Sequence, residues 1–252
     1  AVAFSTKIEG GIAELVMDKP PVNAFAAADW FALAEQVAAL GRSEAVRVLV
    51  IRAEGRGFQC GVDVKELAAD GSLIAAVNRG CYELFANLYD CPVPVIAAVH
   101  GYCLGGGIGI AGSCDLVLCS EDASFGLPEL DRGALGAATH AMRMFGMQEA
   151  RRMLLTGEPI GAAEALRLDG VLRVVPRSEL RAAALELAQK IAVKSPRAVR
   201  LAKWSLNGIE LLDPKQSYRF EQGFTFELYT TPDSQEARDA FAEKREADFG
   251  EK

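Results

Sequence analysis

The sequence predicts an α/β fold made of repeated ββα steps that ends in a C-terminal helical region. Short apolar runs of strand length, such as VRVLVIR at 46–52, alternate with longer amphipathic segments of helical period. From about residue 179 the strand patterns stop and helical patterns follow one another. With 252 residues, 50% of them hydrophobic, the chain can bury a large core.

The elements are predicted in chain order from these patterns and their turn residues. Two strands at 6–9 and 12–17 flank a glycine pair, and the apolar spacing of 26–40 predicts a helix. Buried strands follow at 46–52, 93–99, 115–120 and 124–125, separated by helices at 74–89 and 106–112. Further helices are predicted at 136–145, 147–155, 179–193, 196–208, 214–229 and 233–249. We divide the chain into a core at 1–195 and a helical region at 196–252.

Composition excludes several classes of protein. A net charge of -7 and a pI near 5.1 argue against a nucleic-acid surface, which needs clustered Lys and Arg. The six cysteines form no CxxC pair, and the sequence shows no charged start followed by an apolar segment, so reduced thiols in a cytoplasmic protein are expected rather than three disulfides. No apolar run reaches the length of a membrane span, and two scattered histidines predict no metal site.

Two glycine-rich segments each leave a buried strand and enter a helix. GYCLGGGIGIAG at 101–112 follows PVPVIAAVH, and RAEGRGFQCGVDVKEL at 52–67 begins in a strand as well. The first N–H groups of a helix have no intrahelical partner and attract negative charge, although the glycines could also serve only close packing. Two strand ends that each offer a backbone N–H suit a two-donor oxyanion hole. No GxGxxG stands at the right place in a βαβ unit and GxxxxGK[ST] does not occur, so dinucleotide and P-loop sites are not predicted.

FQCGVDVKEL at 58–67, GYCLGGGIGIAGSCDL and SFGLPEL together resemble the crotonase (enoyl-CoA hydratase/isomerase) superfamily. The resemblance extends over nearly the whole chain, from PPVNAF at 20–25 to the C-terminal helices. It implies a crotonase-like spiral whose core binds an acyl-CoA thioester and needs no cofactor beyond the CoA of its substrate. It also implies that the C-terminal helices build a homotrimer or a dimer of trimers and cap the acyl pocket.

The same resemblance assigns binding roles to residues of both glycine-rich segments. The N–H groups of Val62 and Gly106 would hold the thioester oxygen, with Gly105 beside them. Cys60 and Val62 would lie against the adenine of CoA, and Lys65 would lie near its phosphates.

The hydratases of this superfamily use two glutamates, and the chain retains one. Glu129 stands in FGLPEL, whereas the position three residues beyond Gly106 is Gly109. Glu129 could act as general base or acid if an apolar site raises its pKa, or it could be an ordinary surface residue. The glycine at 109 is expected to make room for a bulky acyl group and to disfavour simple hydration.

The segment after Glu129 offers further candidates for proton transfer. Asp131, Arg132 and His140 follow within one short stretch. His140 and Asp131 are candidate partners of Glu129, although His140 could be an ordinary hydrogen-bonded residue and Asp131 could simply pair with Arg132.

Three functions follow from these residues. RAEGRGF, NRGCY, FGLPELDRGALGAATH and SYRFEQGFTFEL resemble a branch of the superfamily, the ring-opening hydrolases of bacterial steroid catabolism. This likeness implies hydrolytic C–C ring opening of a cyclic β-keto acyl-CoA. The alternatives are an enoyl-CoA hydratase or isomerase of fatty-acid β-oxidation that works with Glu129 alone, and a non-catalytic subunit that binds CoA thioesters.

Overall fold

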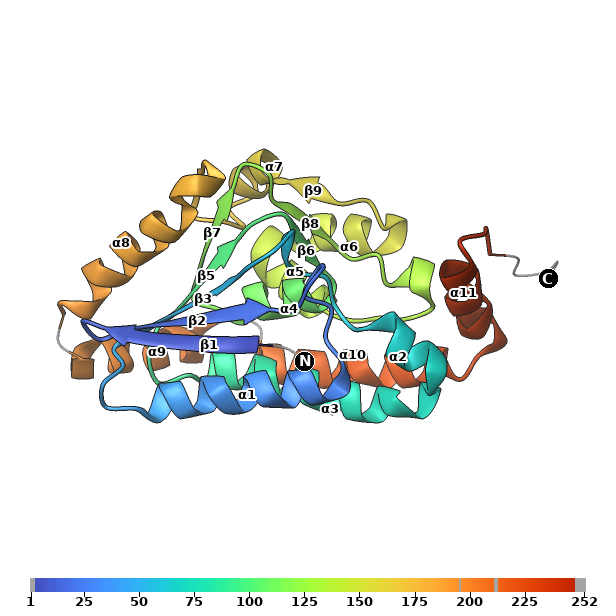
Figure 1. The fold of residues 1–252 in the computed structure, drawn as a ribbon, viewed down its shortest axis with the longest axis horizontal. Coiled ribbons are helices and arrows are strands. Elements are labelled where there is room, and N and C mark those ends of the chain that lie inside the picture. The colour runs from blue at the N-terminus through green and yellow to red at the C-terminus, as the bar shows by residue number, and fades with distance from the viewer. Residues whose placement is uncertain (1–2, 195, 211–212, 248–252) are drawn as a thin grey trace.

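The structure, a computed structural model, describes residues 3–194, 196–210 and 213–247 (Figure 1). Its strands are β1 (Ala3–Glu9), β2 (Ile12–Asp18), β3 (Val48–Ala53), β4 (Gly57–Gln59), β5 (Val95–Val99), β6 (Tyr102–Leu104), β7 (Leu116–Ser120), β8 (Ser124–Gly126), β9 (Ile160–Gly161) and β10 (Arg173–Val175).

Eleven α-helices lie between and after these strands within the described ranges. They are α1 (Ala27–Arg42), α2 (Val64–Ala69), α3 (Ile74–Tyr89), α4 (Gly106–Ser113), α5 (Ala138–Phe145), α6 (Met147–Thr156), α7 (Ala162–Arg167), α8 (Leu180–Ala192), α9 (Pro196–Ile209), α10 (Pro214–Tyr229) and α11 (Pro232–Glu243). Short 3-10 helices stand at Gly71–Leu73 (η1), Leu130–Arg132 (η2) and Arg177–Glu179 (η3).

The strands form two sheets. The larger has the order β1-β2-β3-β5-β7-β10, and the smaller has the order β4-β6-β8-β9. Three consecutive strand pairs, β3/β4, β5/β6 and β7/β8, each give their first strand to the larger sheet and their second to the smaller. The predicted repetition of ββα steps is therefore confirmed. Because β4, β6 and β8 are parallel, the loops that follow them meet at one edge of the smaller sheet.

Both faces of the larger sheet are buried. Along β3, Val48 and Val50 pack against the alanine-rich face of α8, whereas Leu49 and Ile51 point to the core beneath α1 and α3. This alternation follows from the two-residue period of a strand. In Figure 1, α8 and the pair α1 and α3 lie on opposite sides of the larger sheet.

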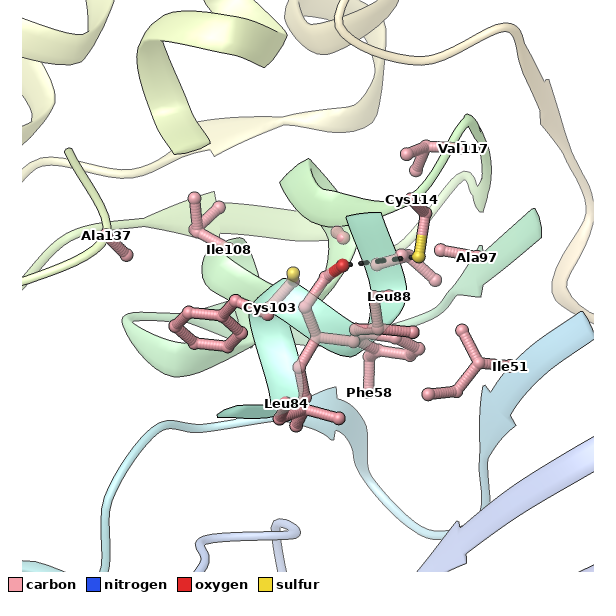
Figure 2. Close-up of a cluster of buried hydrophobic side chains, with 14 of the residues drawn as sticks. Ile51, Phe58, Leu84, Leu88, Ala97, Cys103, Ile108, Cys114, Val117 and Ala137 are labelled. Carbon is pink, nitrogen blue, oxygen red and sulfur yellow. Dashed lines mark hydrogen bonds between the residues drawn. The ribbon is translucent and has the colours of Figure 1, made fainter. Parts of the chain in front are cut away.

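The cysteines are free thiols, as the sequence predicted. Figure 2 shows Cys103 and Cys114 among aliphatic and aromatic side chains, with the Cys114 Sγ donating to the Ile110 carbonyl oxygen at 3.2 Å. Burial raises the pKa of the Cys103 thiol well above its usual value. Five of the six cysteines are buried and Cys60 is half-buried.

Element boundaries differ from the predictions where the backbone becomes left-handed. The helix expected from 136 begins at Ala138 because Ala137 has a φ of 59°. The helix expected over 233–249 ends at Glu243 because Lys244 has a φ of 57°, and Phe249 lies outside the described residues. The short strands β4, β6, β9 and β10 and helix α7 were not predicted, since two or three residues in a strand, or six in a helix, give little periodicity. No described helix is long and apolar enough to cross a membrane.

Candidate active site

The two glycine-rich loops meet at the edge of the smaller sheet. β4 and β6 pair in parallel, so the turn at Gly61 and the turn at Gly105 leave the sheet side by side. Both glycines have a positive φ, 83° and 55°, which other residues rarely adopt. A methyl group on Gly61 would lie 3.5 Å from the Gly106 nitrogen, so the loops are in close backbone contact.

Val62 sits in the first loop with its backbone aligned to Phe25. The Phe25 N–H donates to the Gly61 carbonyl at 3.0 Å, and the Asp63 N–H donates to the Phe25 carbonyl at 2.8 Å. These two bonds flank Val62 and leave its own N–H without a protein acceptor among the described residues. Asp63 then caps α2, its side chain accepting from the Lys65 N–H at 3.0 Å.

Gly106 is the first residue of α4, so its N–H belongs to the helix start that lacks intrahelical acceptors. A methyl group on Gly106 would overlap the fully buried ring of Trp30. The absence of a side chain is therefore required here by close packing as well as by access to the backbone. Val62 and Gly106 both line the same cavity.

Glu129 follows β8 and begins the 3-10 turn η2. Its carbonyl accepts from the N–H groups of Arg132 at 3.0 Å and Ala134 at 2.9 Å, which fixes the backbone. Its side chain reaches back to the second loop, where a methyl group on Gly105 would overlap Oε1. The structure therefore places the Glu129 carboxylate directly against the turn that presents Gly106.

These residues surround a cavity of about 530 Å³. Its walls come from α2, α3, the loop after Glu129 and the C-terminal helices α10 and α11, and most of the lining is apolar. Glu129 is an acidic side chain of this lining, and four cations lie with it: Lys65, Arg132, Arg238 and Lys244. The Glu129 carboxylate thus faces an apolar space that has cations at its rim and two backbone donors at its border.

Comparison with known proteins shows the family of the chain. Residues 7–252 match the family described as enoyl-CoA hydratase/isomerase. The chain belongs to the enoyl-CoA hydratase/isomerase family. The predicted crotonase resemblance is confirmed, and with it the fold: an enoyl-CoA hydratase from Mycobacterium avium subsp. paratuberculosis superposes with a TM-score of 0.88 at 25% identity, covering 100% of both chains.

Two curated members of the family are more similar in sequence. The chain is 48% identical to a (7aS)-7a-methyl-1,5-dioxo-2,3,5,6,7,7a-hexahydro-1H-indene-carboxyl-CoA hydrolase of Rhodococcus jostii, over 95% of this chain and 93% of the relative. It is equally identical to the enzyme of that name from Mycobacterium tuberculosis, over 95% and 98% of the two chains. The likeness to the ring-opening branch of the family is confirmed.

The position of the first hydratase glutamate is filled from another element. A methyl group on Gly109 would overlap the ring of Phe85, which comes from α3. Among the described residues Phe85 lines the cavity and Gly109 does not. The expectation that Gly109 makes room for a bulky acyl group is therefore wrong, because an aromatic ring occupies that room.

His140 lies behind this ring and outside the cavity lining. Its ring centroid is 4.8 Å from that of Phe85 and 5.3 Å from that of Tyr218, and both of those side chains line the cavity. Burial, with a smaller contribution from Arg143, lowers the pKa of His140 to about 3. The structure thus holds His140 neutral in the core and does not bring it to Glu129.

Asp131 also lies apart from the cavity. It is exposed and faces Gly157 at the end of α6, where a methyl group would lie 2.7 Å from its Oδ2. Arg132 turns the other way, lines the cavity, and places its guanidinium 4.9 Å from the centroid of Phe241. The two neighbours therefore point to opposite sides, which adjacent positions in a tight turn allow.

The other predicted binding residues are gathered at the cavity. Cys60, Lys65 and Gly105 all line it together with Val62 and Gly106. Burial raises the pKa of the Cys60 thiol to about 11, so it is not a nucleophile at neutral pH. The described residues contain no group of three side chains suited to hold a metal ion.

Several cavity residues were not identified from the sequence. Ile74, Asn78, Cys81 and Phe85 share one face of α3 and line the cavity. Their spacing of i, i+4, i+7 and i+11 is a signal of one helix face, but it does not tell a cavity wall from a core stripe. The sequence pattern for Arg238, from α11, carries no signal of this kind.

Proposed function

We propose that the protein hydrolyses a C–C bond in the ring of a cyclic β-keto acyl-CoA. Glu129 takes a proton from water, and the resulting hydroxide adds to the ring ketone. Collapse of the tetrahedral adduct breaks the bond between the ketone carbon and the carbon next to the thioester. The ketone carbon leaves as a carboxylic acid, which releases its proton to solvent, and the electron pair of the broken bond passes into the thioester as an enolate. Protonation of the enolate carbon from Glu129 returns the carboxylate.

In this proposal the N–H groups of Val62 and Gly106 hold the thioester oxygen while it carries the enolate charge. Donors fixed before the reaction stabilise such a charge without reorganising, and each is typically worth about 3 kcal/mol of barrier. Cys60 and Lys65, which line the cavity, are proposed to bind the CoA moiety. No cofactor beyond that CoA is needed, because proton transfers and one water balance the reaction.

The observation that carries the proposal is the aromatic ring at the place of a second carboxylate. Hydration of a double bond in this family uses two glutamates, whereas here Phe85 fills the space at Gly109. The proposed ring cleavage needs one group that acts first as a base toward water and then as an acid toward the enolate carbon. Glu129 lies against Gly105, beside the two backbone donors. The 48% identity to two hydrolases of a bicyclic dioxo-indene carboxyl-CoA supports the same chemistry.

The test is proton release measured by pH-stat. Ring opening creates a new carboxylic acid, while hydration of crotonyl-CoA adds water without forming one. We expect proton release with a bicyclic β-keto CoA thioester and none with crotonyl-CoA. Turnover of crotonyl-CoA with no activity on the bicyclic thioester would favour the hydratase alternative instead.

Glu129→Gln separates catalysis from binding. The variant keeps the shape of the side chain and removes the base, so turnover should fall by ~10²-fold or more while CoA-thioester affinity is retained. Unchanged turnover would remove Glu129 from the mechanism. Absence of turnover in the wild-type protein with retained thioester binding would favour the non-catalytic subunit.

The C-terminal region 196–252 is proposed to build a homotrimer or a dimer of trimers as well as to cap the cavity. Support for assembly comes from α9, where Leu201 and Trp204, three residues apart on one helix face, are more than half exposed, at 51% and 76%. Apolar side chains gathered this way commonly mark an interface. A cytoplasmic location is proposed from the six free thiols.

A further inference from the structure

Gln59 is the last residue of β4, just before the first glycine-rich loop, and its polar side chain is fully buried. Its carboxamide makes two bonds to one residue: Oε1 accepts from the Gly61 N–H at 2.8 Å, and Nε2 donates to the Gly61 carbonyl at 2.8 Å. The Gly61 carbonyl also accepts from the Phe25 N–H at 3.0 Å. Gly61 has a left-handed backbone, and glycine by itself can adopt many conformations. Here hydrogen bonds to both its N–H and its carbonyl fix that backbone.

The Gly61 carbonyl and the Val62 N–H belong to the same peptide group. That peptide is trans, since the one cis bond among the described residues joins Pro20 and Pro21. In a trans peptide the N–H points opposite to the C=O within a rigid plane. Holding the carbonyl toward Gln59 and Phe25 therefore directs the Val62 N–H to the opposite side.

Gln59 also contacts the other donor loop. Its Oε1 would lie 3.4 Å from a methyl group on Gly106, and its backbone oxygen would be overlapped by one on Gly107. One buried carboxamide therefore lies between the two residues whose N–H groups border the cavity. Its hydrogen bonds to Gly61 set the direction of the first donor, and its Oε1 lies beside the residue that carries the second.

We propose that Gln59 is a positioning residue that orients the Val62 N–H toward the thioester oxygen. This inference rests on the proposed function, because it takes Val62 and Gly106 as the oxyanion donors. Gln59 does not touch substrate. It acts through the Gly61–Val62 peptide plane, and its removal lets that plane rotate.

The expected effect is a loss of turnover without a matching loss of binding. Gln59→Met keeps the length of the side chain and removes both bonds. Deleting an oxyanion donor costs roughly 10²- to 10³-fold in kcat, and a misdirected donor retains part of its effect. We expect kcat to fall about 10- to 100-fold while KM changes by less than about threefold.

The direct readout is the carbonyl stretch of a bound thioester, recorded as an isotope-edited infrared difference spectrum with [1-¹³C]butyryl-CoA. Butyryl-CoA has no ring and no double bond, so it binds without reacting. Hydrogen bonds from the two donors should move its carbonyl band to lower wavenumber than in free butyryl-CoA. Gln59→Met should move the band back toward the free value at saturating ligand.

The matched control is Cys103→Ala. Cys103 is the strand partner of Gln59, is equally buried, and makes no bond to the Gly61 peptide. It should lose stability and keep both the shifted band and kcat. If Gln59→Met does not fold, Gln59→Asn, which retains the carboxamide but shortens the side chain by one methylene, should give an intermediate band.

The outcomes separate this inference from the proposed function. A wild-type band equal to that of free butyryl-CoA would mean that the oxyanion hole itself is absent. A shifted wild-type band that persists unchanged in Gln59→Met, or in Gln59→Asn where it replaces Met, would overturn the role of Gln59. The expected result is that the carbonyl band moves back toward the value of free butyryl-CoA in Gln59→Met and stays shifted in Cys103→Ala.

Discussion

Replacing His140 by glutamine should remove a pH dependence from the stability of the fold. The imidazole is 1% exposed, with Phe85 and Tyr218 packed edge-on against it, and burial lowers its pKa to about 3. In the unfolded chain a histidine titrates near 6.5. The unfolded state therefore binds a proton below that pH while the folded state does not, and stability falls as the solution is acidified.

The size of the effect follows from the two pKa values. Between pH 7.5 and pH 5 the unfolded chain gains about 2 kcal/mol from protonating this side chain, while the folded state gains almost nothing. This pH interval lies above the range in which carboxylates usually titrate. Carboxylates with a lowered pKa, such as Glu14 and Asp122, make stability fall at more acidic pH. His100 contributes in the same direction, since burial lowers its pKa too.

The assay is urea unfolding at pH 7.5 and pH 5 with protein concentration held fixed. Wild type should lose about 2 kcal/mol more than His140→Gln over this interval, and His100→Gln serves as the matched histidine control. Equal losses in wild type and His140→Gln would refute the buried neutral imidazole. The pH profile of kcat/KM should be the same in both proteins, because His140 does not reach the cavity.

Two further predictions concern the packing at Gly109 and a buried ion pair. Gly109→Glu alone should not create hydratase activity, because its side chain meets the ring of Phe85; paired with Phe85→Ala it should raise crotonyl-CoA hydration above that of either single variant. Lys203→Met should lower the free energy of unfolding by about 3 kcal/mol, because the buried Nζ donates to Asp115 at 2.8 Å and its loss leaves that carboxylate uncompensated.

Each of these has its own control. Hydration by Gly109→Glu alone would show that Phe85 yields to the new side chain. The second variant is paired with Lys203→Met/Asp115→Asn, in which the carboxylate charge is also removed. This double variant should recover part of the lost stability in denaturant unfolding, and no recovery would mean that the ion pair is not the cause.

The sequence by itself determined the repeated strand and helix steps and the two loops that carry the donors. These features are local: strand periodicity, glycines at Gly61 and Gly105, and a helix start at Gly106 are encoded within a few residues of one another. The position of Glu129 was available for the same reason, because it stands in a contiguous stretch. Their meeting at one cavity required only that consecutive parallel strands end at the same edge of a sheet.

The tertiary structure alone decided which side chains reach that cavity. Asp131 and Arg132 are neighbours in sequence, yet one faces Gly157 and the other the cavity. Phe85, 24 residues before Gly109, fills the space left by that glycine, and its ring packs against His140, which does not line the cavity. Such outcomes depend on how rigid elements pack against each other, and close packing admits one side chain into a given volume whatever its distance along the chain.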